Sequence, residues 1–292
     1  VWVDPPDQLC DLTATIRLGQ RARGLGLPVM LDFHYADSWA DPGQQPTPAR
    51  WRAASGTALE DSVRNWTRAA LRTLRANGVV PEAVQIGNEV TNGFLWPDGR
   101  LESGSHAEWA RFAGLMRAAA DGVRAGAPRA RVLVHIDRGG DAEGVKRWFR
   151  RLDAFGVRYD DIALSWYPWW HGGPHRLERT LRTCEDSLRR DVWIVETAYP
   201  WTVEWFDSTH KVLGAGTALG TDHPASPGGQ RRFLDELLVR AARSKRVRGV
   251  FWSEPADRSA PRRGSAWENC ALFDATGRML PAAGVMRRPE PH

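Results

Sequence analysis

Short apolar runs alternate with segments of helical periodicity along almost the whole chain. Buried strands are predicted at the apolar runs 28–34, 83–86, 131–136, 162–167, 192–197 and 249–252. Apolar residues that recur at helical spacing predict helices at 13–25, 59–77, 107–125, 142–155, 177–190 and 230–243. This alternation predicts a parallel sheet, and its regular spacing favours a closed barrel over a doubly wound sheet. The segment between Tyr199 and Gly229 is predicted to be a long irregular loop.

Two of the predicted strands end in a glutamate. Asn88 and Glu89 follow the run that begins at Ala83, and Glu196 ends the run that begins at Val192. In a parallel barrel the carboxyl ends of all strands meet at one rim, so these two carboxylates are expected to share it. Glycoside hydrolysis needs such a pair, one carboxyl group as acid and one as nucleophile or base. For Glu89 alone, a structural ion pair or a helix cap remains an equal alternative.

Composition removes several classes of function. No run of 18 apolar residues could span a membrane, and no glycine-rich phosphate loop follows a predicted strand. The net charge of +5 comes from arginines interspersed with acids on predicted helices, without a nucleic-acid-binding motif. Neither a nucleic acid nor a membrane is therefore expected as a partner. Fifteen tryptophans, many beside Pro, Gly, His or Asp, suit sugar-stacking surfaces in loops, while others are expected to pack in the core.

The cysteines and histidines do not predict a metal or cofactor. Cys10, Cys184 and Cys270 lack metal-ligand spacing, and one disulfide with a remaining thiol is as open as three thiols. The histidines form no HExxH motif or close pair, and cleavage by two glutamates needs no metal.

Six segments of the chain carry one family's motifs in the expected order. They are LDFHYADSWADPGQ (31–44), QIGNE (85–89), LWP (95–97), SWYPWWHG (165–172), VETAYPW (195–201) and WENCALFD (267–274). Together they resemble the endo-β-1,4-galactanases of glycoside hydrolase family 53. The resemblance implies a (β/α)8 barrel that cleaves internal β-1,4-galactosidic bonds of arabinogalactan with retention of configuration. It assigns the general acid/base to Glu89 and the nucleophile to Glu196.

The resemblance also proposes substrate contacts. Asn88 is expected to bind the sugar 2-hydroxyl, and the Tyr167 hydroxyl is expected to hold Glu196 ionised. Further candidates for sugar binding are His34, Asp37, Trp39, Trp169, His171, Trp201, Trp252 and Trp267. A structural role for His34 is as consistent with the sequence as a role in sugar binding. His135 could equally face the cleft or pack in the core, and part of the tryptophan set is expected to pack in the barrel. Asp32 and Glu254 are interpreted as structural.

The chain departs from the family pattern at two places. The last strand ends in Trp252-Ser253-Glu254-Pro255, where the family has Tyr-Trp-Glu-Pro, so an aromatic group near the cleft floor is expected to be lost. Val1–Val3 is expected to be the end of a strand, so the barrel is predicted to be truncated at its N-terminus. Its first strand, first helix and most of its second strand would be missing. The chain shows no signal peptide, although the resemblance implies secretion.

We therefore expect residues 1–292 to form a single catalytic domain, monomeric and extracellular, acting on the galactan of pectin. Two alternatives remain open. One is a barrel endo-glycanase acting on mannan or glucan with the same pair of glutamates. The other is a catalytically impaired galactan-binding barrel, made plausible by the truncation and by Ser253.

Overall fold

The computed structural model describes residues 1–259 and 264–286, and the chain divides into two compact units. Unit 1 comprises Val1–Asp137, Gly144–Leu164 and Leu188–Asp191, and unit 2 comprises Arg138–Glu143, Ser165–Ser187 and Val192–His292. The expectation of one domain over 1–292 stays a prediction.

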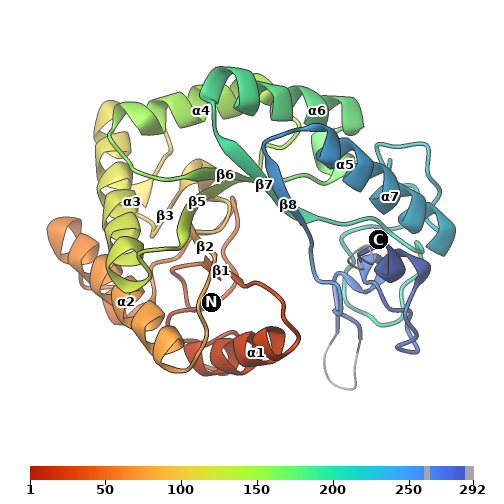
Figure 1. Cartoon of the computed structure of the whole chain (residues 1–292), viewed down its shortest axis with the longest axis horizontal. Coiled ribbons are helices and arrows are strands. Elements are labelled where there is room, and N and C mark those ends of the chain that lie inside the picture. Colours follow the sequence, from red (N-terminus) through yellow and green to blue (C-terminus); the bar gives the residue numbers. More distant parts are fainter. Residues whose placement is uncertain (260–263, 287–292) are drawn as a thin grey trace. The chain divides into compact units, whose positions relative to one another are not determined.

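Unit 1 is built on a parallel sheet in which neighbouring strands follow the order of the chain (Figure 1). Its strands are β1 (Met30–Phe33), β2 (Ala83–Ile86), β5 (Arg131–Ile136) and β6 (Asp161–Ser165), whose last residue already belongs to unit 2. All four residues of β2 are buried, including the polar Gln85, as expected for a strand that is covered on both faces. These strand positions confirm the sequence prediction.

Helices cover the sheet of unit 1. They are α1 (Leu12–Gly24), α2 (Gly56–Ala76), α3 (His106–Gly126) and α4 (Ala142–Ala154), with 3-10 turns η1 (Ala49–Trp51) and η2 (Val90–Asn92) and a hairpin of β3 (Gly93–Phe94) and β4 (Gly99–Arg100). A Cβ on Gly122 of α3 would lie 2.7 Å from the Thr67 Cβ of α2. The two helix backbones therefore pack closely because this position carries no side chain.

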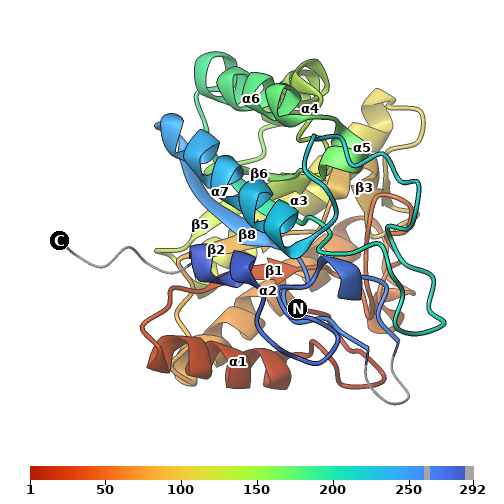
Figure 2. The same ribbon diagram turned by 90° about the vertical axis from the view of Figure 1, so that its right-hand side faces the viewer.

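Unit 2 contains a parallel pair of strands, β7 (Asp191–Thr197, from Val192 on) and β8 (Val247–Trp252), with helix α7 (Pro227–Arg243) packed against β8 (Figure 2). Its other elements are α5 (Pro168–His171), α6 (Pro174–Thr183), η3 (Cys184–Leu188), η4 (Glu268–Cys270) and η5 (Pro281–Met286). The predicted helix 177–190 is partly wrong, because the α-helix ends at Thr183 and continues as the π-helical turn η3.

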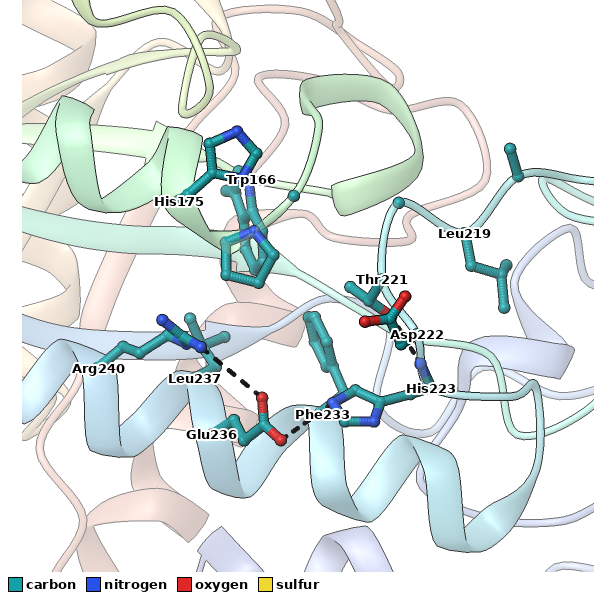
Figure 3. A pocket seen from close by; sticks show the side chains of 14 residues that line it. Trp166, His175, Leu219, Thr221, Asp222, His223, Phe233, Glu236, Leu237 and Arg240 are labelled. Carbon is teal, nitrogen blue, oxygen red and sulfur yellow. Dashed lines mark hydrogen bonds and ion pairs between the residues drawn. The ribbon is translucent and has the colours of Figure 1, made fainter.

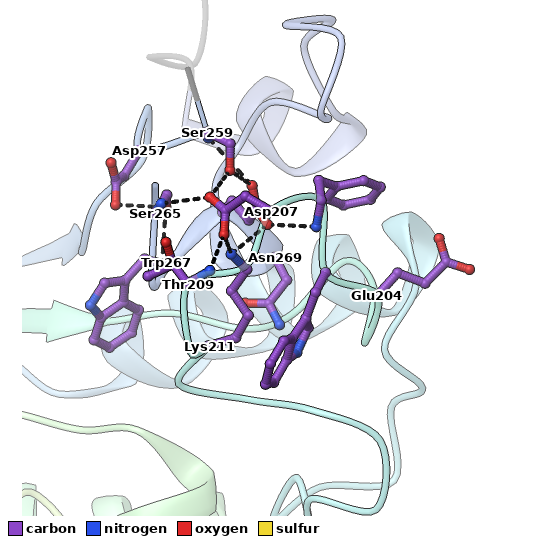
Figure 4. A network of polar contacts seen from close by, with 12 residues as sticks. Glu204, Asp207, Thr209, Lys211, Asp257, Ser259, Ser265, Trp267 and Asn269 are labelled. Carbon is purple, nitrogen blue, oxygen red and sulfur yellow. Dashed lines mark hydrogen bonds and ion pairs between the residues drawn. The ribbon is translucent and has the colours of Figure 1, made fainter. Parts of the chain in front are cut away.

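The irregular segment after β7 is held by a buried ionic cluster (Figure 4). Lys211 is fully buried, and its Nζ bonds to Asp207 and lies 2.8 Å from Glu268 Oε1. Glu268 also accepts a hydrogen bond from the backbone N–H of Phe206. Burial by itself would raise the pKa of Glu268, but the bonds from Lys211 and Ser259 lower it, so this carboxylate is ionised. The cluster thereby connects the loop to Glu268, the residue next to the sugar-binding candidate Trp267.

The first residues of the chain run beside β1 but form no strand, so the expectation of a strand end at Val1–Val3 is wrong. The backbone N–H of His34 donates to the carbonyl of Val1 (3.2 Å), and the N–H of Val3 donates to the carbonyl of Ala36 (2.8 Å). Among the described residues, no helix has the length and apolar character needed to cross a membrane.

Candidate active site

Glu89 stands three residues after the end of the buried strand β2, in a backbone conformation that residues other than glycine rarely adopt. Its φ and ψ are 47° and 50°, in the left-handed region, and the residue is only 9% exposed. Such a conformation costs roughly 1–3 kcal/mol and persists only when its surroundings enforce it. The end of β2 therefore holds this carboxyl group in a strained and mostly buried position, as is common at functional sites.

His135, on β5, contacts the backbone of Glu89. Its Nδ1 lies 3.2 Å from the Glu89 amide nitrogen and 3.1 Å from Asn88 Oδ1. Burial lowers the pKa of His135 to about 3, so the imidazole is neutral at ordinary pH. A neutral Nδ1 either accepts from Glu89 or donates to Asn88, depending on the tautomer. Within unit 1, His135 thus contacts and stabilises the backbone turn at Asn88 and Glu89.

Asn88 is almost fully buried, and its amide is already engaged within unit 1. Its Nδ2 donates to the carbonyl of Ala40 (2.8 Å), and its Oδ1 accepts from Gln85 Nε2 (3.3 Å). The buried side chain of Gln45 donates to the Asn88 carbonyl at 2.7 Å. Contact between Asn88 and a sugar hydroxyl stays a prediction, and it would use the second N–H of the amide.

The loop after β1 contains the other candidates in unit 1. Both ring nitrogens of His34 have partners, because Nε2 lies 3.1 Å from Asp32 Oδ2 and Nδ1 accepts from the Ala40 N–H. Burial alone would raise the pKa of Asp32, yet the nearby His34 brings it down to about 2. Asp37 accepts backbone N–H groups from Asp4 and Ala49. These contacts fit a structural role for His34 and Asp37, whereas Trp39 is 42% exposed and presents its ring to solvent.

Glu196 lies at an irregularity of β7 in unit 2. Ile194 pairs with Val250 and Thr197 pairs with Trp252, so two residues of β7 stand opposite one residue of β8. A bulge of this kind re-aims a side chain at the end of a strand. The Tyr167 hydroxyl donates to Glu196 Oε2 at 2.8 Å, as the sequence suggested, and lies 2.8 Å from Ser253 Oγ.

Aromatic side chains surround Tyr167 in unit 2. Its ring centroid lies 5.1–5.4 Å from those of Trp169, Trp170 and Trp267, and 6.1 Å from that of His171. His171 also accepts the Tyr167 backbone N–H at its Nδ1 (2.9 Å). Trp170 is 57% exposed, and the sequence argument overlooked it in favour of Trp169. Only the orientation of the one-turn helix α5 shows which of the two adjacent rings faces solvent.

The remaining two tryptophan candidates differ in their surroundings. The Trp201 ring stacks on Phe206 with centroids 5.5 Å apart and donates its N–H to the Glu268 carbonyl. Trp252 is only 6% exposed, and its N–H is donated to the carbonyl of Cys270. A buried ring leaves no face for a sugar, so we leave Trp252 out of the sugar-binding set that we propose below.

A separate hollow of about 760 Å³ lies between α6, α7 and the loop 218–223 of unit 2 (Figure 3). Three of its charged groups pair with one another. Arg240 lies beside Glu236, and His223 Nε2 lies 3.3 Å from the same carboxylate. These pairings give the hollow a structural explanation, and we assign it no ligand.

Comparison with known proteins shows what the chain is similar to. The family described as Glycosyl hydrolase family 53 matches residues 1–286. An arabinogalactan endo-beta-1,4-galactanase of Cellvibrio japonicus is 35% identical over 289 residues, covering 94% of this chain and 74% of that protein. One of Thermothelomyces thermophilus is 30% identical over 300 residues, covering 99% and 86%. The solved GH53 catalytic domain of Ignisphaera aggregans has 34% identity and a TM-score of 0.91, covering 98% of this chain and 82% of that one.

These matches confirm the resemblance drawn from the motifs. Together with the parallel strands and their covering helices, the match to a solved catalytic domain gives an α/β fold of the TIM-barrel type. The chain is therefore an enzyme that belongs to glycosyl hydrolase family 53.

Proposed function

We propose that this enzyme is a retaining endo-β-1,4-galactanase that hydrolyses internal bonds of galactan and arabinogalactan. The observation that carries the proposal is the placement of Glu89 and Glu196. Each follows or ends a parallel strand in a chain whose named relatives are arabinogalactan endo-β-1,4-galactanases. A retaining mechanism requires the acid and the nucleophile to lie roughly 5 to 5.5 Å apart across the bound sugar.

The reaction would proceed in two displacements. In the first, protonated Glu89 donates its proton to the glycosidic oxygen while ionised Glu196 attacks the anomeric carbon, which releases the leaving chain and forms a glycosyl ester. In the second, Glu89 takes a proton from water, and the resulting hydroxide attacks the anomeric carbon and frees Glu196. Tyr167 orients the nucleophile throughout.

The sugar-binding surface that we propose combines exposed and half-buried aromatic rings with polar groups. Trp39 in unit 1 and Trp169, Trp170, Trp201 and Trp267 in unit 2 supply apolar faces for galactose rings. We propose that Asn88 and His171 contribute hydrogen bonds. We also propose that the enzyme acts outside the cell, as a monomeric single domain, on the galactan side chains of pectin.

Reducing-end release from galactan, β-mannan and β-glucan tests the substrate, and NMR of the first product tests its configuration. We expect activity on galactan with the β-anomer formed first. Glu196→Ala should abolish turnover while galactan still binds, and the matched exposed variant Glu143→Ala should keep full activity. Binding without release by the unmodified chain would favour a sugar-binding role, and preferential release from mannan or glucan would reassign the substrate.

Chemical rescue separates the two glutamates. With an activated aryl galactobioside and azide, Glu89→Ala should give the β-azide, because the glycosyl ester still forms and azide replaces water in the second displacement. Glu196→Ala should give the α-azide, because azide then attacks the opposite face directly. The reverse pattern of products, or full activity of Glu196→Ala on galactan, would overturn the assignment of roles.

A further inference from the structure

Ser253 is a polar residue that the mechanism above does not use, although it touches the machinery of the nucleophile. Its Oγ lies 2.8 Å from the Tyr167 hydroxyl, and that hydroxyl lies 2.8 Å from Glu196 Oε2. All three residues belong to unit 2. The resemblance to the family led us to expect a tryptophan at this position.

The direction of the two hydrogen bonds follows from the chemistry of the groups. Tyrosine has a single hydroxyl proton, and an ionised carboxylate can only accept. Tyr167 therefore gives its proton to Glu196 and accepts the proton of Ser253. The result is a directed chain from Ser253 through Tyr167 to Glu196, in which each bond polarises the next.

The backbone of β8 places Ser253 firmly in this chain. Its N–H donates to the carbonyl of Thr197 at 2.8 Å, immediately after the bulge that carries Glu196. Tyr167 is only 2% exposed, so bulk water has little access to replace a lost donor. Ser253 and Glu196, the two ends of this hydrogen-bonded series, are thus both held by the strand pair β7 and β8.

We propose that Ser253 is a positioning residue for the nucleophile, acting through Tyr167. It fixes the rotation of the Tyr167 O–H bond and so keeps that proton on Glu196 Oε2, which holds the carboxylate in one orientation during attack. This inference rests on the proposed function, since it takes Glu196 to be the nucleophile.

The test is a double-mutant cycle measured on galactan. Ser253→Ala should lower kcat about three- to tenfold, the scale of one neutral hydrogen bond, and change KM less than about twofold. Ser253→Thr keeps the hydroxyl and should restore most of kcat. In a Tyr167→Phe background, Ser253→Ala should cause no further loss, because the group through which it acts is gone. Ser244→Ala, which removes a hydroxyl bonded to Glu185 at the end of α7, is the matched control with unchanged kcat.

Three results would overturn the inference. They are an unchanged kcat in Ser253→Ala, an equal loss in Ser253→Thr, and a loss in the Tyr167→Phe background as large as in the original chain. Thermal unfolding of each variant shows whether a loss comes from the fold. Failure of the proposed function is recognised separately, because Glu196→Ala would then keep its activity whatever Ser253→Ala does.

Discussion

The hydrogen bond from Tyr167 to Glu196 allows a quantitative prediction. Tyr167→Phe removes one hydroxyl and keeps the ring, so the packing against Trp169, Trp170 and Trp267 is preserved and no large cavity forms. The lost bond is 2.8 Å long and has a charged acceptor. Hydrogen bonds to charged groups contribute about 1.5–3 kcal/mol. At 1.36 kcal/mol per factor of ten, kcat/KM should fall about 10- to 160-fold.

The assay is the initial rate of reducing-end release over a range of galactan concentrations, together with thermal unfolding of each variant. Tyr199→Phe is the matched control. Its hydroxyl is bonded to Thr221 Oγ1 and to the carbonyl of His223, and it makes no contact with Glu196 in the described structure. This variant should lose some stability and keep its kcat/KM.

Two outcomes would contradict the role of the Tyr167 hydroxyl. If Tyr167→Phe keeps kcat/KM within twofold at an unchanged melting temperature, the hydroxyl does not orient the nucleophile. If Tyr199→Phe loses as much activity as Tyr167→Phe, the effect arises from general loosening of unit 2 and not from the bond to Glu196.

Two further predictions concern acid stability and substrate binding. His135 has a folded-state pKa of about 3, below its ordinary value, so the unfolded chain binds the extra proton and stability falls as the pH drops below about 6.5. His135→Gln should remove roughly 2 kcal/mol of the stability difference between pH 7 and pH 5, measured by urea unfolding, and an unchanged difference would contradict the buried neutral state. Trp170→Ala should raise KM for galactan several-fold with little change in kcat, because it removes an exposed stacking face. Trp205→Ala, also exposed, is the control, and equal KM values in the two variants would exclude Trp170 as a sugar contact.

The pattern of apolar and polar residues was enough to predict the alternation of strands and helices and the positions of the two glutamates near strand ends. Mostly apolar runs such as 83–86 and 131–136 are too short for a typical helix and so indicate strands, and the change from apolar residues to Asn88-Glu89 marks where the first of them ends. The order of the motifs was enough to indicate the family. The end of α6 at Thr183 was not predicted, because the whole segment 177–190 has helical periodicity. The π-helical turn at Cys184–Leu188 gives no separate periodic signal in the sequence.

Which candidate side chains have an exposed ring face or a free hydrogen-bonding group for a sugar depends on the tertiary contacts of each residue. Trp252 and Trp170 look alike in sequence, yet one is buried with its N–H donated internally and the other is exposed. The contact of Ser253 with Tyr167 joins residues 86 positions apart, and that of His135 with Glu89 joins residues 46 apart. Local patterns report the periodicity of one segment at a time, whereas exposure and hydrogen bonding depend on which segments the fold brings together.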